Sequence, residues 1–171
     1  MSYAIVYDSR TGNTEALARA VAAALPSEGR LAFGRVDEVD RAAVAQADRV
    51  YAGFWTHRGD CGDALAEVLA SLADKDVFLF GTAGFGADET YFAGVMARVA
   101  VHLPESARIV GTFMCQGRMP ASVRARYAQT AEAKPEQAAR MHQLIENFDE
   151  AASHPDDDDL ARLREAVQAA S

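Results

Sequence analysis

Cysteine is scarce in this sequence, and the spacing of the two cysteines matches no disulfide or metal-binding motif. Cys61 and Cys115 form no CxxC pair, and no histidine cluster lies near either of them along the chain. A disulfide framework or a zinc site needs more such residues at closer spacing. We therefore expect two reduced thiols with a structural role, because free cysteine is usually buried.

Long apolar runs and an excess of positive charge are also missing. No apolar stretch approaches the ~20 residues of a membrane-spanning helix. The N-terminus lacks the basic region of a signal peptide, so we interpret it as a first strand. The chain has 17 Lys and Arg against 25 Asp and Glu, a formal charge of −8. Such a balance repels nucleic acid and anionic membranes and favours basic protein partners. We expect a cytoplasmic protein; nothing indicates an oligomeric state.

The sequence does contain an alternation of strand and helix patterns. Runs of apolar, β-branched and aromatic residues predict five strands, at 3–7, 31–36, 50–54, 77–80 and 109–114. Apolar residues at helical spacing occupy 17–25, 65–72 and 92–99. Strands that are apolar throughout must be covered on both faces, which is typical of a parallel sheet between helices. The sequence therefore predicts a doubly wound α/β fold, with a ligand at the carboxyl ends of the strands.

The C-terminal part departs from this alternation. From residue 119 the sequence is polar and rich in alanine, with one apolar helical face at 141–148 and another at 160–167. The aspartate run 156–159 is interpreted as the capped start of a helix, with an acidic interaction tail as the alternative. We expect one domain over 1–171, with a core of 1–118 and a helical C-terminal extension of 119–171.

The strongest functional signal lies between the first strand and the first helix pattern. This loop reads Ser9-Arg10-Thr11-Gly12-Asn13-Thr14. A phosphate at a helix N-terminus meets free backbone N–H groups and the positive end of the helix dipole, and glycine lets the backbone approach closely. A polar turn with Thr14 as N-cap is the alternative. The P-loop pattern of nucleoside triphosphatases is absent.

This loop resembles the phosphate loop of the flavodoxin family, which reads T/S-x-T-G-N-T in the same position. The resemblance covers the order of elements from residue 3 to about 117. It implies FMN as the cofactor and a five-stranded sheet in the order 2-1-3-4-5. It also implies redox partner proteins, a reductase as donor and an oxidoreductase as acceptor.

Two further loops agree with the resemblance. The loop after the third strand contains Phe54, Trp55, Thr56, His57, Gly59 and Asp60. It offers an aromatic surface and a flexible peptide, and the resemblance implies that the Gly59 carbonyl faces N5 of the reduced flavin. The loop after the fourth strand, Thr82-Ala83-Gly84-Phe85-Gly86, is small enough for its backbone to face the pyrimidine edge of the flavin.

These two loops also differ from the family pattern. Trp55 precedes Gly59 by four residues, so His57 or Arg58 can also lie over the ring, and Trp55 as a core residue is the alternative. Flavodoxins commonly place a stacking tyrosine in the later loop, but no tyrosine stands at the matching position here, and Phe85 is the nearest aromatic residue. The identity of the second stacking residue therefore stays open.

A narrower resemblance links the chain to a bacterial flavodoxin subgroup termed BilS, associated with a bilirubin reductase. It rests on the stretches 53–56, 81–86, 111–117, 146–149 and 153–155.

No loop presents a catalytic triad or a pair of carboxylates, so an electron carrier is favoured over a stand-alone enzyme. The negative charge of the chain disfavours reduced FMN and predicts a low potential. The alternatives are an FMN-dependent NAD(P)H:quinone-type reductase and a non-redox binding domain.

Overall fold

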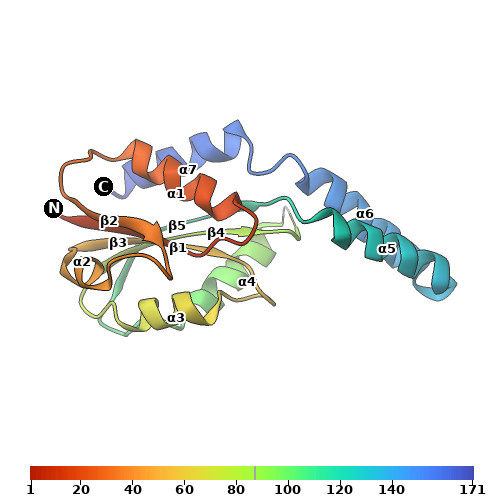
Figure 1. Ribbon diagram of the computed structural model, residues 1–171, viewed down its shortest axis with the longest axis horizontal. Helices are drawn as coiled ribbons and strands as arrows, with labels where there is room; N and C mark the ends of the chain where they lie inside the picture. Colours follow the sequence, from red (N-terminus) through yellow and green to blue (C-terminus); the bar gives the residue numbers. More distant parts are fainter. Residues whose placement is uncertain (87) are drawn as a thin grey trace.

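Five parallel strands form the centre of the molecule, and helices cover both faces of the sheet (Figure 1). The computed structural model describes residues 1–86 and 88–171. The strands are β1 (Tyr3–Tyr7), β2 (Arg30–Arg35), β3 (Arg49–Trp55), β4 (Asp76–Ala83) and β5 (Arg108–Gln116). Their order is β2-β1-β3-β4-β5, and every pairing is parallel. The predicted doubly wound fold and its strand order are confirmed.

The helices follow the strands in turn. They are α1 (Asn13–Ala24), α2 (Arg41–Gln46), α3 (Asp63–Ala70), α4 (Glu89–Ala100), α5 (Ala121–Ala133), α6 (Ala138–Ala151) and α7 (Asp157–Ala169), with a 3₁₀ turn at Pro135–Gln137. Helix α2 is absent from the sequence prediction, because it is six residues long and buries only Val44. Its first turn is held by the Asp40 side chain, which accepts hydrogen bonds from the N–H groups of Ala42 and Ala43.

The sheet separates two apolar layers. In β1, Ala4 and Val6 join the layer under α2, α3 and α4, whereas Tyr3, Ile5 and Tyr7 join the layer under α1 and α7. All five are buried, so β1 has no solvent-facing side. Burying a large apolar side chain contributes roughly 1.5–3 kcal/mol. The continuous apolar run that predicted a doubly covered strand is explained by this central position.

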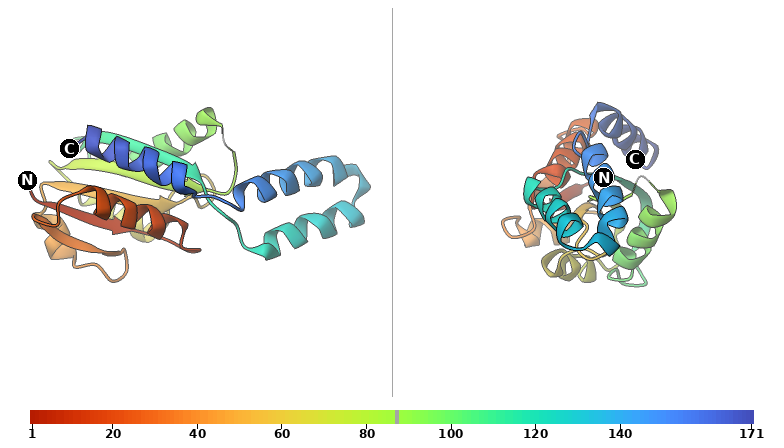
Figure 2. Two further views of the ribbon diagram at one scale, coloured as in Figure 1. Left: turned by 90° about the horizontal axis from the view of Figure 1, so that it is seen from above. Right: turned by 90° about the vertical axis from the view of Figure 1, so that its right-hand side faces the viewer.

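The C-terminal helices divide into two parts with different packing. Helices α5 and α6 form a hairpin, residues 121–151, that projects beyond the carboxyl edge of the sheet (Figures 1 and 2). We call this hairpin the arm. Tyr127, Met141 and Phe148 are buried between its helices, so the apolar face of α6 is covered chiefly by α5. Helix α7 returns to the domain and lies beside α1 and β5. The division at residue 118 stays a prediction.

The aspartate run 156–159 starts α7 through a capping box. The Asp156 carboxylate accepts a hydrogen bond from the Asp159 N–H at 2.9 Å, and the Asp159 carboxylate accepts one from the Asp156 N–H at 3.1 Å. The imidazole Nδ1 of His154 lies 2.6 Å from Asp159, which is 1% exposed. The capping interpretation of this run is confirmed.

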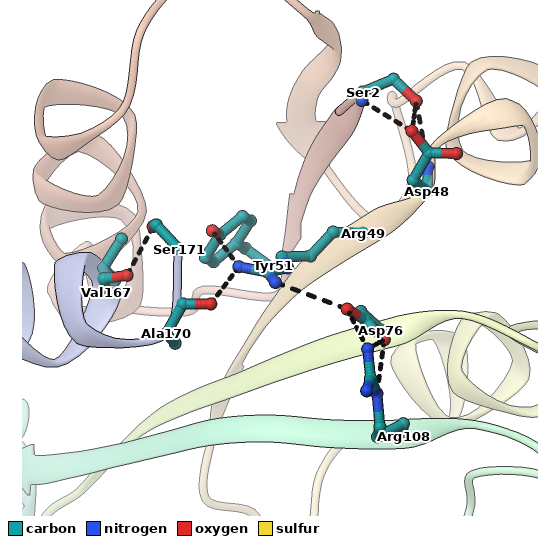
Figure 3. A network of polar contacts seen from close by, with 9 residues as sticks. All are labelled: Ser2, Asp48, Arg49, Tyr51, Asp76, Arg108, Val167, Ala170 and Ser171. Atoms are coloured by element: carbon teal, nitrogen blue, oxygen red, sulfur yellow. Dashed lines mark hydrogen bonds and ion pairs between the residues drawn. The ribbon is translucent and has the colours of Figure 1, made fainter.

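The other end of α7 is attached to the start of the sheet (Figure 3). Arg49, the first residue of β3, donates a hydrogen bond to the Ala170 carbonyl and lies 3.4 Å from the Asp76 carboxylate. Asp76 also accepts two hydrogen bonds of 2.9 Å from Arg108. These contacts lie at the amino ends of the strands, opposite the edge where the ligand is expected.

Within the described residues, no helix combines the length and the apolar character needed to cross a membrane.

Candidate functional site

A cavity of about 400 Å³ opens at the carboxyl ends of the strands. Its lining comes from the 9–14 loop, the ends of β3 and β4, and the segment that leads from β5 into α5. The predicted site residues in that lining are Arg10, Thr11, Asn13, Trp55, Thr56, Thr82, Ala83, Gly84 and Phe85. Three loops that are far apart in the sequence thus meet at one edge of the sheet, as expected for parallel strands.

The 9–14 loop prepares the N-terminus of α1. Gly12 has φ +86° and forms the N-cap without a side chain. The Ser9 hydroxyl accepts a hydrogen bond from the Glu15 N–H at 3.3 Å, and the Thr14 hydroxyl lies 3.1 Å from that of Thr82. Each hydroxyl therefore already takes part in one hydrogen bond inside the protein. The exposed side-chain donors of this loop are Arg10 and Thr11.

Trp55 lies half-buried at the end of β3. Its indole N–H donates a hydrogen bond of 3.1 Å to Asp8. The Arg10 guanidinium lies 5.6 Å from the centre of the indole ring, and the His57 ring lies 5.1 Å from it. A flat ligand that stacks on Trp55 must share this ring with Arg10 or displace it, since cation–π contacts need the open face.

Phe54, the residue before Trp55, lies in the core. It is 0% exposed, and its ring packs so closely on Gly81 of the neighbouring strand that a Cβ there would lie 2.4 Å from it. Alternation along β3 explains the difference, because consecutive side chains point to opposite faces of the sheet.

The loop expected to be flexible is a closed turn. His57 and Asp60 exchange two backbone hydrogen bonds of 2.8 and 3.0 Å, and Arg58 and Gly59 both have positive φ, as in a type I′ turn. The Gly59 carbonyl accepts a 2.6 Å hydrogen bond from Arg98 of α4. It is therefore attached to α4 in this structure.

Asp60 is the last residue of the same turn, and its carboxylate has polar contacts with Cys61 and His102. Its carboxylate accepts a hydrogen bond of 2.7 Å from the Cys61 N–H and lies 3.1 Å from the Nε2 of His102. Burial opposes its ionisation, but the contacts with Cys61 and His102 outweigh it and hold the pKa of Asp60 below its ordinary value.

A second cavity of about 440 Å³ adjoins the first. The two cavities share Thr56, Gly84 and Phe85, and the second is completed by Arg58, Gly59, Tyr91 and Arg98. Phe85 is 39% exposed. Gly84 and the Phe85 side chain therefore border both cavities, one lined by the 9–14 loop and the other by the turn at 57–60.

Comparison with known proteins identifies the family. A family model of the flavodoxin domain matches residues 4–168. The chain belongs to the flavodoxin family. The flavodoxin-like domain-containing protein BilS of Clostridium symbiosum is 37% identical, and the match covers 96% of this chain and 93% of that protein. BilS of Clostridioides difficile is 27% identical over 94% and 90% of the two chains.

Solved structures agree on the fold. Oxidised flavodoxin 2 from Bacillus cereus superposes with a TM-score of 0.57 and 17% identity, covering 99% of this chain and 97% of that one. The resemblance to flavodoxins and to their BilS subgroup is thus confirmed. This flavodoxin is an FMN-type electron-transfer protein.

The residues that line the main cavity of this flavodoxin fit FMN. The Thr56 hydroxyl is buried without a hydrogen-bond partner in the part of the chain that the structure describes, and Thr56 lines the cavity. A buried polar atom without a partner is costly, so it marks a place for a polar ligand atom. The aromatic surface of Trp55 and the guanidinium of Arg10 complement a flat ring and a phosphate.

Sequence reasoning missed the residues that close this cavity from the C-terminal side. Arg118, Met119 and Arg126 belong to the lining, and the Asn13 amide is hydrogen-bonded to the Arg118 carbonyl at 2.9 Å. Among the described residues, neither arginine forms an ion pair with a carboxylate, and the same is true of Arg10. Three arginines free of carboxylates around one cavity, in a chain of charge −8, indicate an anionic ligand.

Proposed function

We propose that this flavodoxin binds one FMN per chain in the cavity at the carboxyl ends of the strands. The phosphate lies against Arg10, Thr11 and the N-terminus of α1, and the ring lies between Trp55 and the 82–86 loop. The observation that carries the proposal is a Thr56 hydroxyl that has no hydrogen-bond partner within residues 1–86 and 88–171, in a cavity with three arginines that form no ion pair with a carboxylate of those residues. Both features match a ligand that joins a polar flat ring to a dianion.

Bound FMN supplies the redox chemistry, taking up and releasing electrons one or two at a time. The chain binds and orients the cofactor, and Trp55 and Phe85 shield it from water. The overall charge of −8 opposes the negative charge that reduction adds, which supports a low potential. Arg10, Arg118 and Arg126 offset the phosphate locally.

We propose further that a partner reductase accepts these electrons. The likeness to BilS proteins supports a bilirubin reductase system as the acceptor. Within the described residues, the cavity contains no nucleophile with a neighbouring base, which supports a carrier rather than an enzyme that acts alone. The reduced protein should therefore pass electrons to a bilirubin reductase in a stopped-flow mixture. Sustained oxidation of NADPH by the isolated flavoprotein would instead favour the quinone-reductase alternative.

Ligand preference tests the site directly. Trp55 is the single tryptophan, so its fluorescence should be quenched as FMN binds. Thr11→Ala should weaken FMN about ten- to a hundredfold, because a hydrogen bond to a charged group contributes ~1.5–3 kcal/mol. Riboflavin, which lacks the phosphate, should be unaffected. Thr112→Ala, an exposed threonine on β5, is the matched control. Equal losses of affinity for FMN and riboflavin would contradict the proposed phosphate position. A wild-type protein that does not bind FMN would contradict the proposed function.

A further inference from the structure

One side chain of the arm is hydrogen-bonded to the loop that follows β4. Asn147 belongs to α6, and its amide nitrogen donates to the Gly84 carbonyl at 2.8 Å. Its amide oxygen accepts from the Gly86 N–H at 3.1 Å and from the Gln116 side chain at 3.3 Å. Asn147 is 61 to 63 positions from this loop in the sequence. The arm and the 84–86 loop are therefore connected by direct polar contacts.

The amide is well suited to this contact. A carboxamide donates and accepts at the same time, so one side chain can hold a carbonyl and an N–H that lie two residues apart. Gln116, which is 4% exposed at the end of β5, directs its own amide N–H at the Asn147 oxygen. This contact fixes which end of the Asn147 amide faces Gly86.

The loop itself has little to define its shape. Gly86 has φ +71°, and Gly84 has no side chain. Glycine loses more conformational freedom on folding than any other residue, so a loop with two glycines needs external contacts to adopt one conformation. Met119 supplies a second contact, since a Cβ on Gly84 would lie 2.5 Å from its sulfur.

Phe85 lies between the two glycines that Asn147 holds, and it lines both cavities. We propose that Asn147 is a positioning residue for the flavin: by fixing the backbone at Gly84 and Gly86, it holds Phe85 and the loop against the ring. The inference rests on the proposed FMN site. It assigns to the arm a role in cofactor binding, although Asn147 itself does not line the main cavity.

Two variants and a control test this role. Asn147→Ala removes all three hydrogen bonds, whereas Asn147→Asp keeps an acceptor for the Gly86 N–H and loses the donor to the Gly84 carbonyl. Gln143→Ala, one turn earlier on α6 and exposed, is the matched control. For Asn147→Ala we expect the dissociation constants of FMN and riboflavin to rise by the same factor, about tenfold, since the loop faces the ring and not the phosphate. Tenfold corresponds to about 1.4 kcal/mol.

Two further readouts separate positioning from a general loss of stability. Amide exchange of the apoprotein should be faster at Gly86 in Asn147→Ala and remain slow in Asn147→Asp. At saturating FMN, where affinity no longer matters, the visible absorption bands of the bound flavin should shift in Asn147→Ala and remain as in wild type in Gln143→Ala.

The outcomes distinguish this inference from the proposed function. If Asn147→Ala binds both ligands like Gln143→Ala, with unchanged flavin bands, the positioning role is refuted, while the Thr11→Ala comparison still supports the FMN site. A loss confined to FMN would also refute it, because that pattern belongs to the phosphate. If the wild-type protein binds no flavin, the proposed function fails. Unchanged amide exchange at Gly86 in Asn147→Ala would then show independently that Asn147 does not fix the backbone of this loop.

Discussion

Arg49 offers the sharpest test of how α7 is held on the sheet. Its side chain is 7% exposed and reaches the Ala170 carbonyl at the end of α7 as well as the Asp76 carboxylate (Figure 3). Its Nε has no hydrogen-bond partner among the described residues. Arg49→Met replaces the guanidinium with an apolar side chain of similar length, so it removes the polar contacts and leaves no large cavity.

The expected loss follows from opposing terms. The charged hydrogen bond to the Ala170 carbonyl contributes ~1.5–3 kcal/mol. The contact with Asp76 is long at 3.4 Å, and Asp76 keeps its two hydrogen bonds from Arg108, so removing Arg49 leaves no buried charge unpaired. The variant also no longer has the free-energy cost of burying a guanidinium and its unpartnered Nε, and this offsets part of the loss. The net destabilisation should be about 1–2 kcal/mol.

Urea unfolding followed by circular dichroism measures this effect. With a slope of about 2 kcal/mol/M in urea, the midpoint should fall by about 0.5–1 M. Amide exchange should accelerate in the last turn of α7 and not in the arm. A midpoint equal to or above that of wild type would refute the reasoning, since it would mean that desolvation outweighs the contacts of Arg49.

The same network predicts a pH dependence. Hydrogen bonds from Arg108, and to a lesser degree from Arg49, hold the pKa of Asp76 below its ordinary value, although partial burial opposes this. A carboxyl group with a lowered pKa in the folded state stabilises the protein above its unfolded pKa of about 3.9, and this contribution is lost as the pH falls through the folded pKa. Asp76→Asn should therefore reduce the loss of stability between pH 5 and pH 2, as measured by urea midpoints across that range.

Three further predictions concern single residues. Gly59→Val should cost about 1–2 kcal/mol in urea unfolding, because φ is +83° and a Cβ would lie 2.9 Å from the Arg98 guanidinium; Gly59→Asn, which tolerates positive φ, should cost less. Gly94→Ala should raise stability by ~0.5–1 kcal/mol, since Gly94 lies inside α4 and a Cβ there meets no atom within 4 Å; a lower midpoint would contradict this. Burial raises the pKa of Cys61 to about 12 and also raises that of Cys115, so neither thiol of the native protein should react with iodoacetamide at pH 8, whereas both should react in urea.

The elements with the strongest local signals were predictable from the sequence. Central strands such as β1 and β3 consist mostly of apolar residues because both of their faces are covered, and α1 begins directly after Gly12, its N-cap. The three loops at the carboxyl edge followed from the alternation of strands and helices, since parallel strands place all such loops at one edge.

Two features could not be predicted in the same way: helix α2, and which element covers the apolar face of α6. Helix α2 is too short for a periodic pattern, and a single buried valine leaves no recurring signal. The apolar residues 141–148 indicated that a face must be covered, but not that α5 would cover it away from the sheet. Periodicity specifies which side of a helix is apolar and carries no information about its partner.

The sequence by itself thus determined the fold class, the edge that carries the loops and the family resemblance, because these depend on local patterns that repeat along the chain. Only the tertiary structure decided which side chains of those loops face the cavity, that Phe54 lies in the core while Trp55 lies at the mouth, and that Asn147 reaches the loop after β4. Such contacts join residues that are far apart in the sequence; Asn13 and Arg118, for example, are separated by 105 positions. Their geometry depends on how complete helices and strands pack, and local sequence does not specify that packing.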